Sequence, residues 1–261
     1  MTTKAAQIDS LTPLRGIAAI LVVLFHLTGL AYLQNLGEIF PNTSIISRGY
    51  LWVDFFFVLS GFIITHVYGE RFTAGLKWSE VREFLIARIA RLYPLHFVAL
   101  CTTVLTYVLI FSKMPAPKSE GAFSMSEIYN WSALPFHFLW LIGFGLTKMT
   151  WNVPAWSIST EWWTYLLTLP LFRYLNRGVS KRTSLVPVGC VAALWVLVSY
   201  HESKSLDITF DLGVLRCLFS FTIGICLYQF YKTETAKRLL SSDGATLAAL
   251  TLTLLVLHFP R

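Results

Sequence analysis

Charged residues are scarce in this chain of 261 residues. Asp, Glu, Lys and Arg make up 13% of it, which is about half their share in a typical soluble domain. Hydrophobic residues make up 55%, and the mean hydropathy is +0.60. This composition excludes an ordinary soluble globular enzyme and predicts a polytopic membrane protein.

Several signatures of other protein classes are also missing. No run of Lys and Arg and no basic stretch interleaved with aromatic residues is present, so the formal net charge of +7 does not indicate a nucleic-acid partner. The four cysteines (Cys101, Cys190, Cys217 and Cys226) lie in apolar stretches, without a CxxC motif or histidines at metal-ligand spacing. We therefore expect neither disulfides nor a metal site.

Long apolar runs dominate the chain instead. A helix needs about 20 mainly apolar residues to cross the hydrocarbon core of a bilayer. Runs close to that length follow one another with short connectors at 14–33, 50–68, 84–111, 131–146, 156–174, 185–200, 212–231 and 245–259. The pattern predicts an all-α transmembrane bundle that forms one domain over residues 1–261, with the first run retained as a span and not cleaved as a leader.

Basic residues predict which loops face the cytoplasm, because Lys and Arg favour that side. The basic loop 173–182 falls on the wrong side if all eight runs cross, whereas the acidic connector 201–211 is expected outside. The conflict disappears if the run 131–146, which contains Pro135 and His137, does not cross. We therefore predict about seven spans plus one re-entrant or half-depth segment, with the N-terminus inside.

Ionisable residues within predicted spans are the first candidates for function, since they are costly at membrane depth. His26, Asp54, Glu161 and Arg216 all fall in the outer half of the predicted bundle, at similar depth. The structural alternatives are a buried ion pair between an acid and Arg216, and a His26 ring that only bonds a neighbouring backbone carbonyl. The remaining histidines lie near segment ends or in loops, where an interfacial role is expected: His66, His96, His137, His201 and His258.

Arginines at the predicted cytoplasmic mouth suit an anionic ligand. Arg15 and His26 are eleven residues apart, so they share one helix face. Arg88 and Arg91, three residues apart, present two guanidinium groups, which bind phosphate well. The alternative is that these residues only mark the cytoplasmic boundary.

Five stretches together resemble the acyltransferase-3 family, polytopic membrane enzymes that O-acylate cell-surface glycans and some small molecules. The stretches are LTPLRGIAAILVVLFHL at 11–27, GYLWVDFFFVLSGFIIT at 49–65, RIARLYPLHF at 88–97, VPAWSISTEWWTYL at 153–166 and RCLFSFTIGICLY at 216–228. The resemblance implies that Arg15 and His26 are the family's key residues in the first helix. It places two further family signatures on Phe56, Phe57, Ser60, Gly61, Trp156, Ser157 and Glu161. Because family members typically have ten spans, this chain is expected to be a C-terminally shortened member.

The resemblance also implies a reaction: transfer of an acyl group, with acetyl expected, from cytosolic acyl-CoA to a glycan or lipid-linked sugar hydroxyl. His26 acts as general base or carries the acyl group, and Glu161 or Asp54 orients its ring. Arg15, Arg88 and Arg91 hold the CoA phosphates. Ser60, Gly61, Trp156, Ser157 and Arg216 are expected to bind substrate or support the motifs.

The expected setting is a bacterial inner membrane, with the lipid bilayer as a partner and acyl-CoA as co-substrate in place of a tightly bound cofactor. Two alternatives remain. One is a transporter or flippase of a glycan or acyl donor, although no second copy of the broken segment 131–154 is found. The other is an inactive truncated member.

Overall fold

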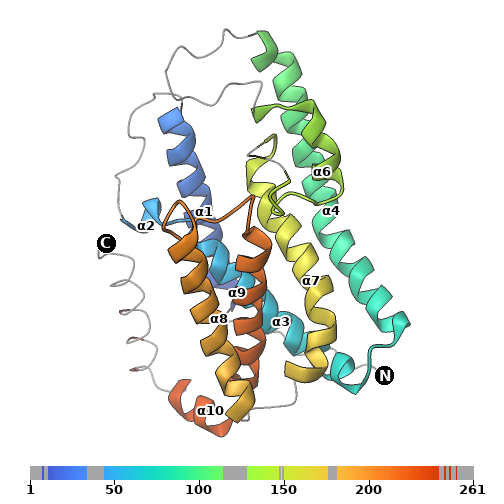
Figure 1. The fold of residues 1–261 in the computed structure, drawn as a ribbon, viewed down its shortest axis with the longest axis vertical. Coiled ribbons are helices and arrows are strands. Elements are labelled where there is room, and N and C mark those ends of the chain that lie inside the picture. The colour runs from blue at the N-terminus through green and yellow to red at the C-terminus, as the bar shows by residue number, and fades with distance from the viewer. Residues whose placement is uncertain are drawn as a thin grey trace.

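The computed structural model describes residues 8, 11–33, 44–113, 128–146, 148, 150–175, 181–240, 244, 247 and 251. Within these ranges, all regular secondary structure is helical (Figure 1). The longer helices are α1 (Leu11–Leu33), α3 (Leu51–Ala74), α4 (Trp78–Leu109), α7 (Trp156–Leu175), α8 (Lys181–Tyr200) and α9 (Gly213–Tyr231). The short elements are α2 (Ser44–Ser47), η1 (Phe111–Lys113), η2 (Trp131–Ala133), α6 (Leu134–Phe138), η3 (Val153–Ala155) and α10 (Glu234–Leu240). The predicted all-α class is confirmed.

Among the residues that the structure describes, four helical segments are long and apolar enough to cross a membrane: Leu11–Thr28, Leu51–Ala74, Trp78–Lys113 and Gly213–Tyr231. The apolar part of α8, Ser184–Tyr200, is shorter. The predicted run 245–259 lies almost wholly outside the described residues. The predicted number of about seven crossings and the side of the membrane on which each loop lies therefore stay predictions.

The run 131–146 does not form a spanning helix. It begins as η2 and α6, with Pro135 in the first turn of α6, and continues as turns up to residue 146. Five helical residues in α6 rise only about 7.5 Å, against the roughly 30 Å of a hydrocarbon core. The segment therefore does not form one long helix, and its predicted re-entrant or half-depth position in the membrane stays a prediction.

Helices α3 and α9 cross at the centre of the bundle, where two glycines allow close backbone approach. A Cβ atom at Gly61 would lie 2.1 Å from the carbonyl oxygen of Phe221, and one at Gly224 would lie 2.0 Å from that of Val58. The largest buried cluster lies next to this crossing and draws side chains from α3, α4, α7 and α9, including Phe72, Phe84, Tyr165, Phe172 and Phe221. The crossing fixes α3 and α9, which carry Asp54 and Arg216.

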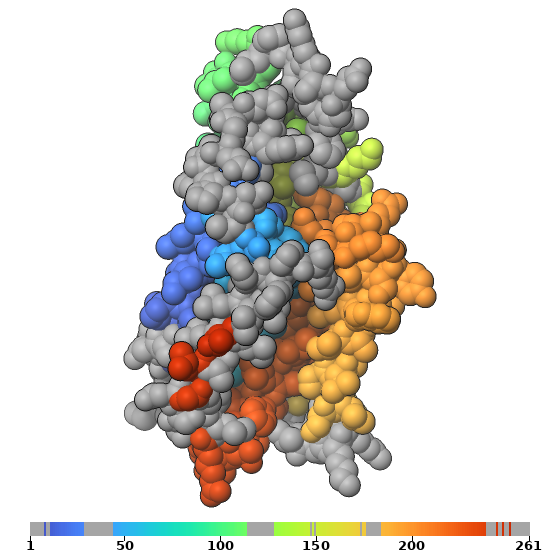
Figure 2. Space-filling view, turned by 90° about the vertical axis from the view of Figure 1, so that its left-hand side faces the viewer, coloured from blue at the N-terminus to red at the C-terminus, as the bar shows by residue number. Residues whose placement is uncertain are grey.

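Helix α1 lies at the surface of the bundle, as Figure 2 shows. Its residues Ile17, Ile20 and Val23 are each more than half exposed, whereas Ala18 is fully buried. An apolar face of this kind is expected where a helix meets lipid.

Candidate active site

Arg216 and Asp54 form an ion pair that joins α9 to α3. The Arg216 Nε donates to Asp54 Oδ1 at 3.0 Å, and its Nη2 donates to Oδ2 at 2.7 Å. The same guanidinium donates to the carbonyl oxygens of Ile208 (3.0 Å) and Tyr50 (2.8 Å), while Ser220 Oγ donates to Asp54 Oδ1 at 3.1 Å. The Arg216 side chain is fully buried and all three of its nitrogens are engaged. The ion pair that the sequence offered as an alternative is therefore present, and a catalytic role for Asp54 stays a prediction.

Trp156 packs against this ion pair from the start of α7. The Arg216 Cζ lies 5.2 Å from the centre of the Trp156 ring, close enough for a cation–π contact. The Trp156 ring also meets Phe57 edge to face, with the centroids 6.0 Å apart. Ser157 donates from Oγ to the carbonyl oxygen of Pro154 at 3.0 Å, within the turn that leads into α7. Trp156 and Ser157 therefore both have a structural role: Trp156 packs on the ion pair, and Ser157 stabilises the turn before α7.

Glu161 lies one turn further along α7 and is held by a tyrosine. The Tyr165 hydroxyl donates to Glu161 Oε1 at 2.6 Å, and it lies 3.1 Å from Ser60 Oγ on α3. The Cys217 thiol of α9, fully buried, is within electrostatic range of both Glu161 and Asp54. The two acids therefore belong to one region of the bundle, as the sequence predicted.

The part of α1 that carries His26 packs against Tyr50, the residue that precedes α3. The Phe25 ring contacts the His26 ring, with centroids 5.4 Å apart, and the Tyr50 ring, with centroids 6.0 Å apart. Tyr50 is the residue whose carbonyl accepts a hydrogen bond from Arg216. The structure thus places the part of α1 that carries His26 near the start of α3, which carries Asp54, and the constellation of His26 with Asp54 and Arg216 stays a prediction.

A backbone carbonyl fixes the orientation of the His26 ring. Its Nδ1 lies 2.8 Å from the carbonyl oxygen of Val22, so Nδ1 is assigned as the protonated nitrogen and Nε2 as the basic one. This bond orients the ring through Nδ1, and the expectation that Glu161 or Asp54 acts on the ring stays a prediction. Val22 lies four residues before His26 on the same helix, so this hydrogen bond forms within α1 and needs no residue from another helix.

Asp207, which the sequence analysis did not single out, lies in the loop between α8 and α9. Its side chain is exposed at the surface; partial desolvation raises the pKa of Asp207, while the charges of Arg216, His26 and His201 oppose that rise. Asp207 is thus within electrostatic range of both His26 and the ion pair. Its position in an acidic connector was the only signal in the sequence.

The three predicted donor-binding arginines differ in their surroundings. Arg15 on α1 is half-buried, Arg88 on α4 is half-buried, and Arg91 is exposed. The Arg88 guanidinium packs over the rings of Tyr68 and Phe84, at 5.8 and 5.6 Å from their centres. Its Nε is buried and has no hydrogen-bond partner in the described part of the chain. An unpaired N–H on a guanidinium fits an anionic ligand such as a phosphate.

His96 and His137 are buried, which corrects the interfacial role expected for them. Both side chains are at most 1% exposed, and their rings are nearly parallel with centroids 6.5 Å apart. His96 Nε2 lies 3.0 Å from the carbonyl oxygen of His137, and His137 Nε2 lies 3.0 Å from Thr150 Oγ1. The pair therefore fastens the non-spanning segment to α4. The sequence did not indicate this contact, because each histidine is flanked by apolar residues and the two are far apart in the chain.

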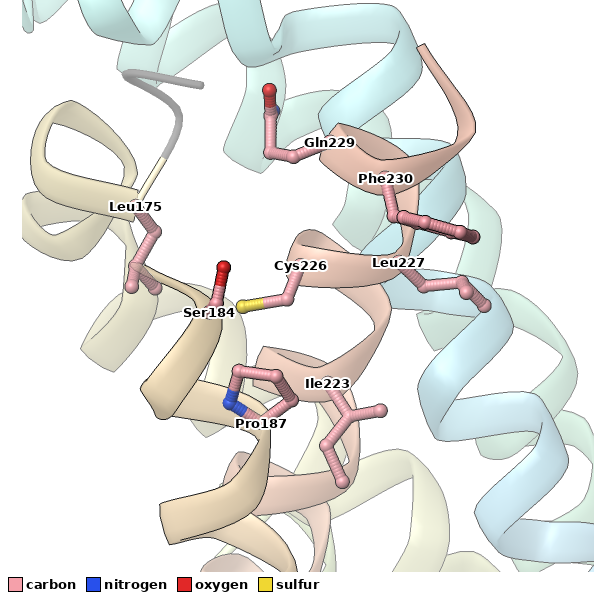
Figure 3. Close-up of a pocket in the computed structure, with 8 residues that line it drawn as sticks. All are labelled: Leu175, Ser184, Pro187, Ile223, Cys226, Leu227, Gln229 and Phe230. Atoms are coloured by element: carbon pink, nitrogen blue, oxygen red, sulfur yellow. The ribbon is translucent and has the colours of Figure 1, made fainter. Parts of the chain in front are cut away.

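A separate pocket of about 290 Å³ lies between the ends of α7, α8 and α9 (Figure 3). Its wall is mostly apolar, with Ser184, Cys226 and Gln229 as the polar contributors. None of the predicted site residues lines it. The candidate active site is therefore elsewhere, among α1, α3, α7 and α9.

Comparisons with known proteins agree with this motif assignment. The acyltransferase-3 family model, described as an acyltransferase domain, matches residues 8–261. "Protein 2 in picA locus" from Rhizobium radiobacter is 29% identical over 197 residues, which cover 72% of this chain and 92% of the relative. The peptidoglycan O-acetyltransferase OatA of Listeria monocytogenes is 24% identical over 206 residues, 76% of this chain and 30% of the relative.

The acyltransferase MdmB of Streptomyces mycarofaciens is 28% identical over 210 residues, which cover 78% of this chain and 49% of the relative. The alignments thus span less than half of both OatA and MdmB. No solved structure matches the chain.

Proposed function

The chain belongs to the acyltransferase-3 family, and from that membership we propose that it transfers an acetyl group from cytosolic acyl-CoA to a hydroxyl group of a cell-envelope glycan. Acyl transfer itself follows from the family. The donor, the acetyl group and the glycan acceptor are the proposal. Relatives named as peptidoglycan O-acetyltransferases support the choice of acceptor.

The observation that carries the proposal is the position of His26. Its Nδ1 is held by a backbone carbonyl, which leaves Nε2 as the basic nitrogen, and both His26 and Arg216 are within electrostatic range of Asp207. An imidazole is suited to act as a general base in proton transfer. An ionisable residue within a candidate membrane span is typical of a functional site.

In the proposed reaction, Nε2 of His26 accepts the proton of the acceptor hydroxyl while that oxygen attacks the thioester carbonyl of acyl-CoA. The C–S bond then breaks, and the imidazolium returns the proton to the departing thiolate, giving free CoA and an O-acyl ester. The negative charge of Glu161 stabilises the imidazolium. In an alternative mechanism, His26 carries the acyl group from donor to acceptor, and the overall reaction has the same substrates and products.

Arg15 and Arg88 are the residues proposed to hold the donor. Arg88 has an unpaired, buried Nε, and Arg15 shares the helix face of His26. Both side chains suit the phosphates of CoA, whose thioester then extends toward His26.

The test is mass spectrometry of glycans from a bacterial host that lacks its own O-acetyltransferases and expresses this chain. Wild-type chain should add acetyl esters to the glycan, and His26→Ala should not, at equal membrane insertion. His66→Gln is the matched control, because His66 is another histidine of a candidate span and should leave acetylation intact. Accumulation of unmodified glycan outside the cell, without acetyl esters, would support a flippase instead.

A further inference from the structure

The Tyr165 hydroxyl lies between two of the family motifs. It donates to Glu161 Oε1 at 2.6 Å and lies 3.1 Å from Ser60 Oγ. Glu161 and Tyr165 are four residues apart on α7, whereas Ser60 comes from α3. A single hydroxyl therefore connects the acid of one motif to the serine of the other.

The Tyr165 ring is fixed independently of its hydroxyl. The side chain is 3% exposed, and its ring meets Phe84 of α4 and Phe221 of α9 edge to face, with centroids 5.6 and 5.8 Å away. Aromatic packing from two neighbouring helices holds the hydroxyl at one position. Glu161, in contrast, is only half-buried and has a flexible side chain, so its hydrogen bond to Tyr165 selects its orientation.

We infer that Tyr165 is a positioning residue for Glu161, and that Ser60 acts on the reaction through Tyr165 and not by touching substrate. This inference rests on the proposed function. The hydroxyl holds the Glu161 carboxyl group in the orientation that stabilises the imidazolium of His26. Ser60 in turn orients the hydroxyl from the opposite helix.

The position of Arg88 agrees with this role. Its guanidinium packs over the Phe84 ring, and that ring contacts the ring of Tyr165. Tyr165 thus stands between the arginine proposed for the donor and the acid proposed for the chemical step. A shift of Tyr165 would change the geometry at both ends.

Tyr165→Phe is a clean perturbation, because it keeps the packed ring and removes one oxygen atom. A hydrogen bond to a carboxylate is worth about 1.5 to 3 kcal/mol, so kcat should fall by about 10- to 100-fold while KM stays unchanged. Ser60→Ala should give a smaller fall in kcat in the same direction. Tyr228→Phe is the matched control, since it removes a tyrosine hydroxyl that bonds His66 instead; it should keep wild-type kcat.

Turnover is measured with radiolabelled acetyl-CoA and muramic-acid-containing glycan fragments, on purified chain in lipid nanodiscs. In the Glu161→Gln background, Tyr165→Phe should have almost no further effect, because both changes remove the same contribution. Equal effects of Tyr165→Phe in both backgrounds would overturn the positioning role, as would full activity of the single variant.

Infrared difference spectra against Glu161→Gln isolate the Glu161 carboxyl band without any turnover. Tyr165→Phe should shift this band, because the carboxyl group loses its hydrogen bond, and Tyr228→Phe should leave it in place. An unmoved band in Tyr165→Phe overturns the inference. Absence of turnover in the wild-type chain instead rejects the proposed function, and the infrared measurement still decides whether Tyr165 holds Glu161.

Discussion

Removing one member of the Arg216–Asp54 ion pair should destabilise the protein far more than removing both. Arg216→Met leaves the Asp54 carboxylate without its cation and removes the donors to the carbonyl oxygens of Tyr50 and Ile208. Asp54→Asn leaves a fully buried guanidinium without a counter-charge. Breaking a buried pair from one side typically costs about 3 to 5 kcal/mol.

A loss of that size should lower the unfolding temperature by on the order of 10 °C. The assay is a thermal scan of intrinsic fluorescence in detergent, for which the nine tryptophans supply the signal. The double variant Asp54→Leu, Arg216→Met replaces both charges with apolar groups and should recover much of the loss. Glu234→Gln is the control, because it breaks the exposed Lys237–Glu234 pair of α10 and should leave the transition in place.

These variants form a double-mutant cycle, and its decisive quantity is the coupling free energy between Asp54 and Arg216. If the single variants unfold at the wild-type temperature, or if the double variant loses the sum of the single losses, the ion pair does not hold α3 to α9. A stable but inactive Asp54→Asn would instead favour the catalytic role that the sequence suggested for Asp54.

The remaining predictions concern packing, pH and donor binding. Gly61→Ala should lower the free energy of unfolding by about 1 to 3 kcal/mol, because the new Cβ would clash with the carbonyl oxygen of Phe221. Gly189→Ala is the control, since the space around Gly189 is open, and it should not destabilise the protein. Denaturant titration measures both variants. Partial desolvation raises the pKa of Asp207, so the stability that this residue contributes is present below its ordinary pKa near 4 and is lost as the pH rises through the raised value; because Asp207 is exposed, this contribution is small. The unfolding temperature of the wild-type chain should therefore fall slightly relative to Asp207→Asn as the pH rises above about 4, and parallel curves would contradict this. Arg88→Ala should weaken the binding of acetyl-CoA, measured by calorimetry, and Arg88→Lys should restore the affinity only in part. An unchanged affinity in Arg88→Ala would mean that Arg88 only packs against its aromatic neighbours.

Apolar run length predicted most of the helices, because burial in lipid leaves the backbone few alternatives to helix. It predicted their ends less well. Helix α4 begins at Trp78, six residues before the predicted run, since helical hydrogen bonding continues through polar residues such as Glu80 and Arg82. The non-spanning segment was recognised from its proline and its short length.

The candidate site was predicted as a set of residues but not as a set of contacts. The scarcity of ionisable residues in spans identified His26, Asp54, Glu161 and Arg216, and the structure shows the ion pair among them. Sequence reasoning missed Tyr165, because tyrosine is common in membrane helices, although its i,i+4 spacing from Glu161 was a usable signal.

The measurement that tests the central claim most directly is acetyl transfer by the purified chain with and without the His26 imidazole. Radiolabelled acetyl-CoA and muramic-acid-containing glycan fragments are supplied to nanodiscs that hold wild type, His26→Ala or His66→Gln at equal amounts. Loss of a general base typically lowers the rate by about 10²- to 10⁴-fold, so His26→Ala should fall by that factor while it still binds acetyl-CoA, and His66→Gln should match wild type. Near-wild-type transfer by His26→Ala would contradict the account.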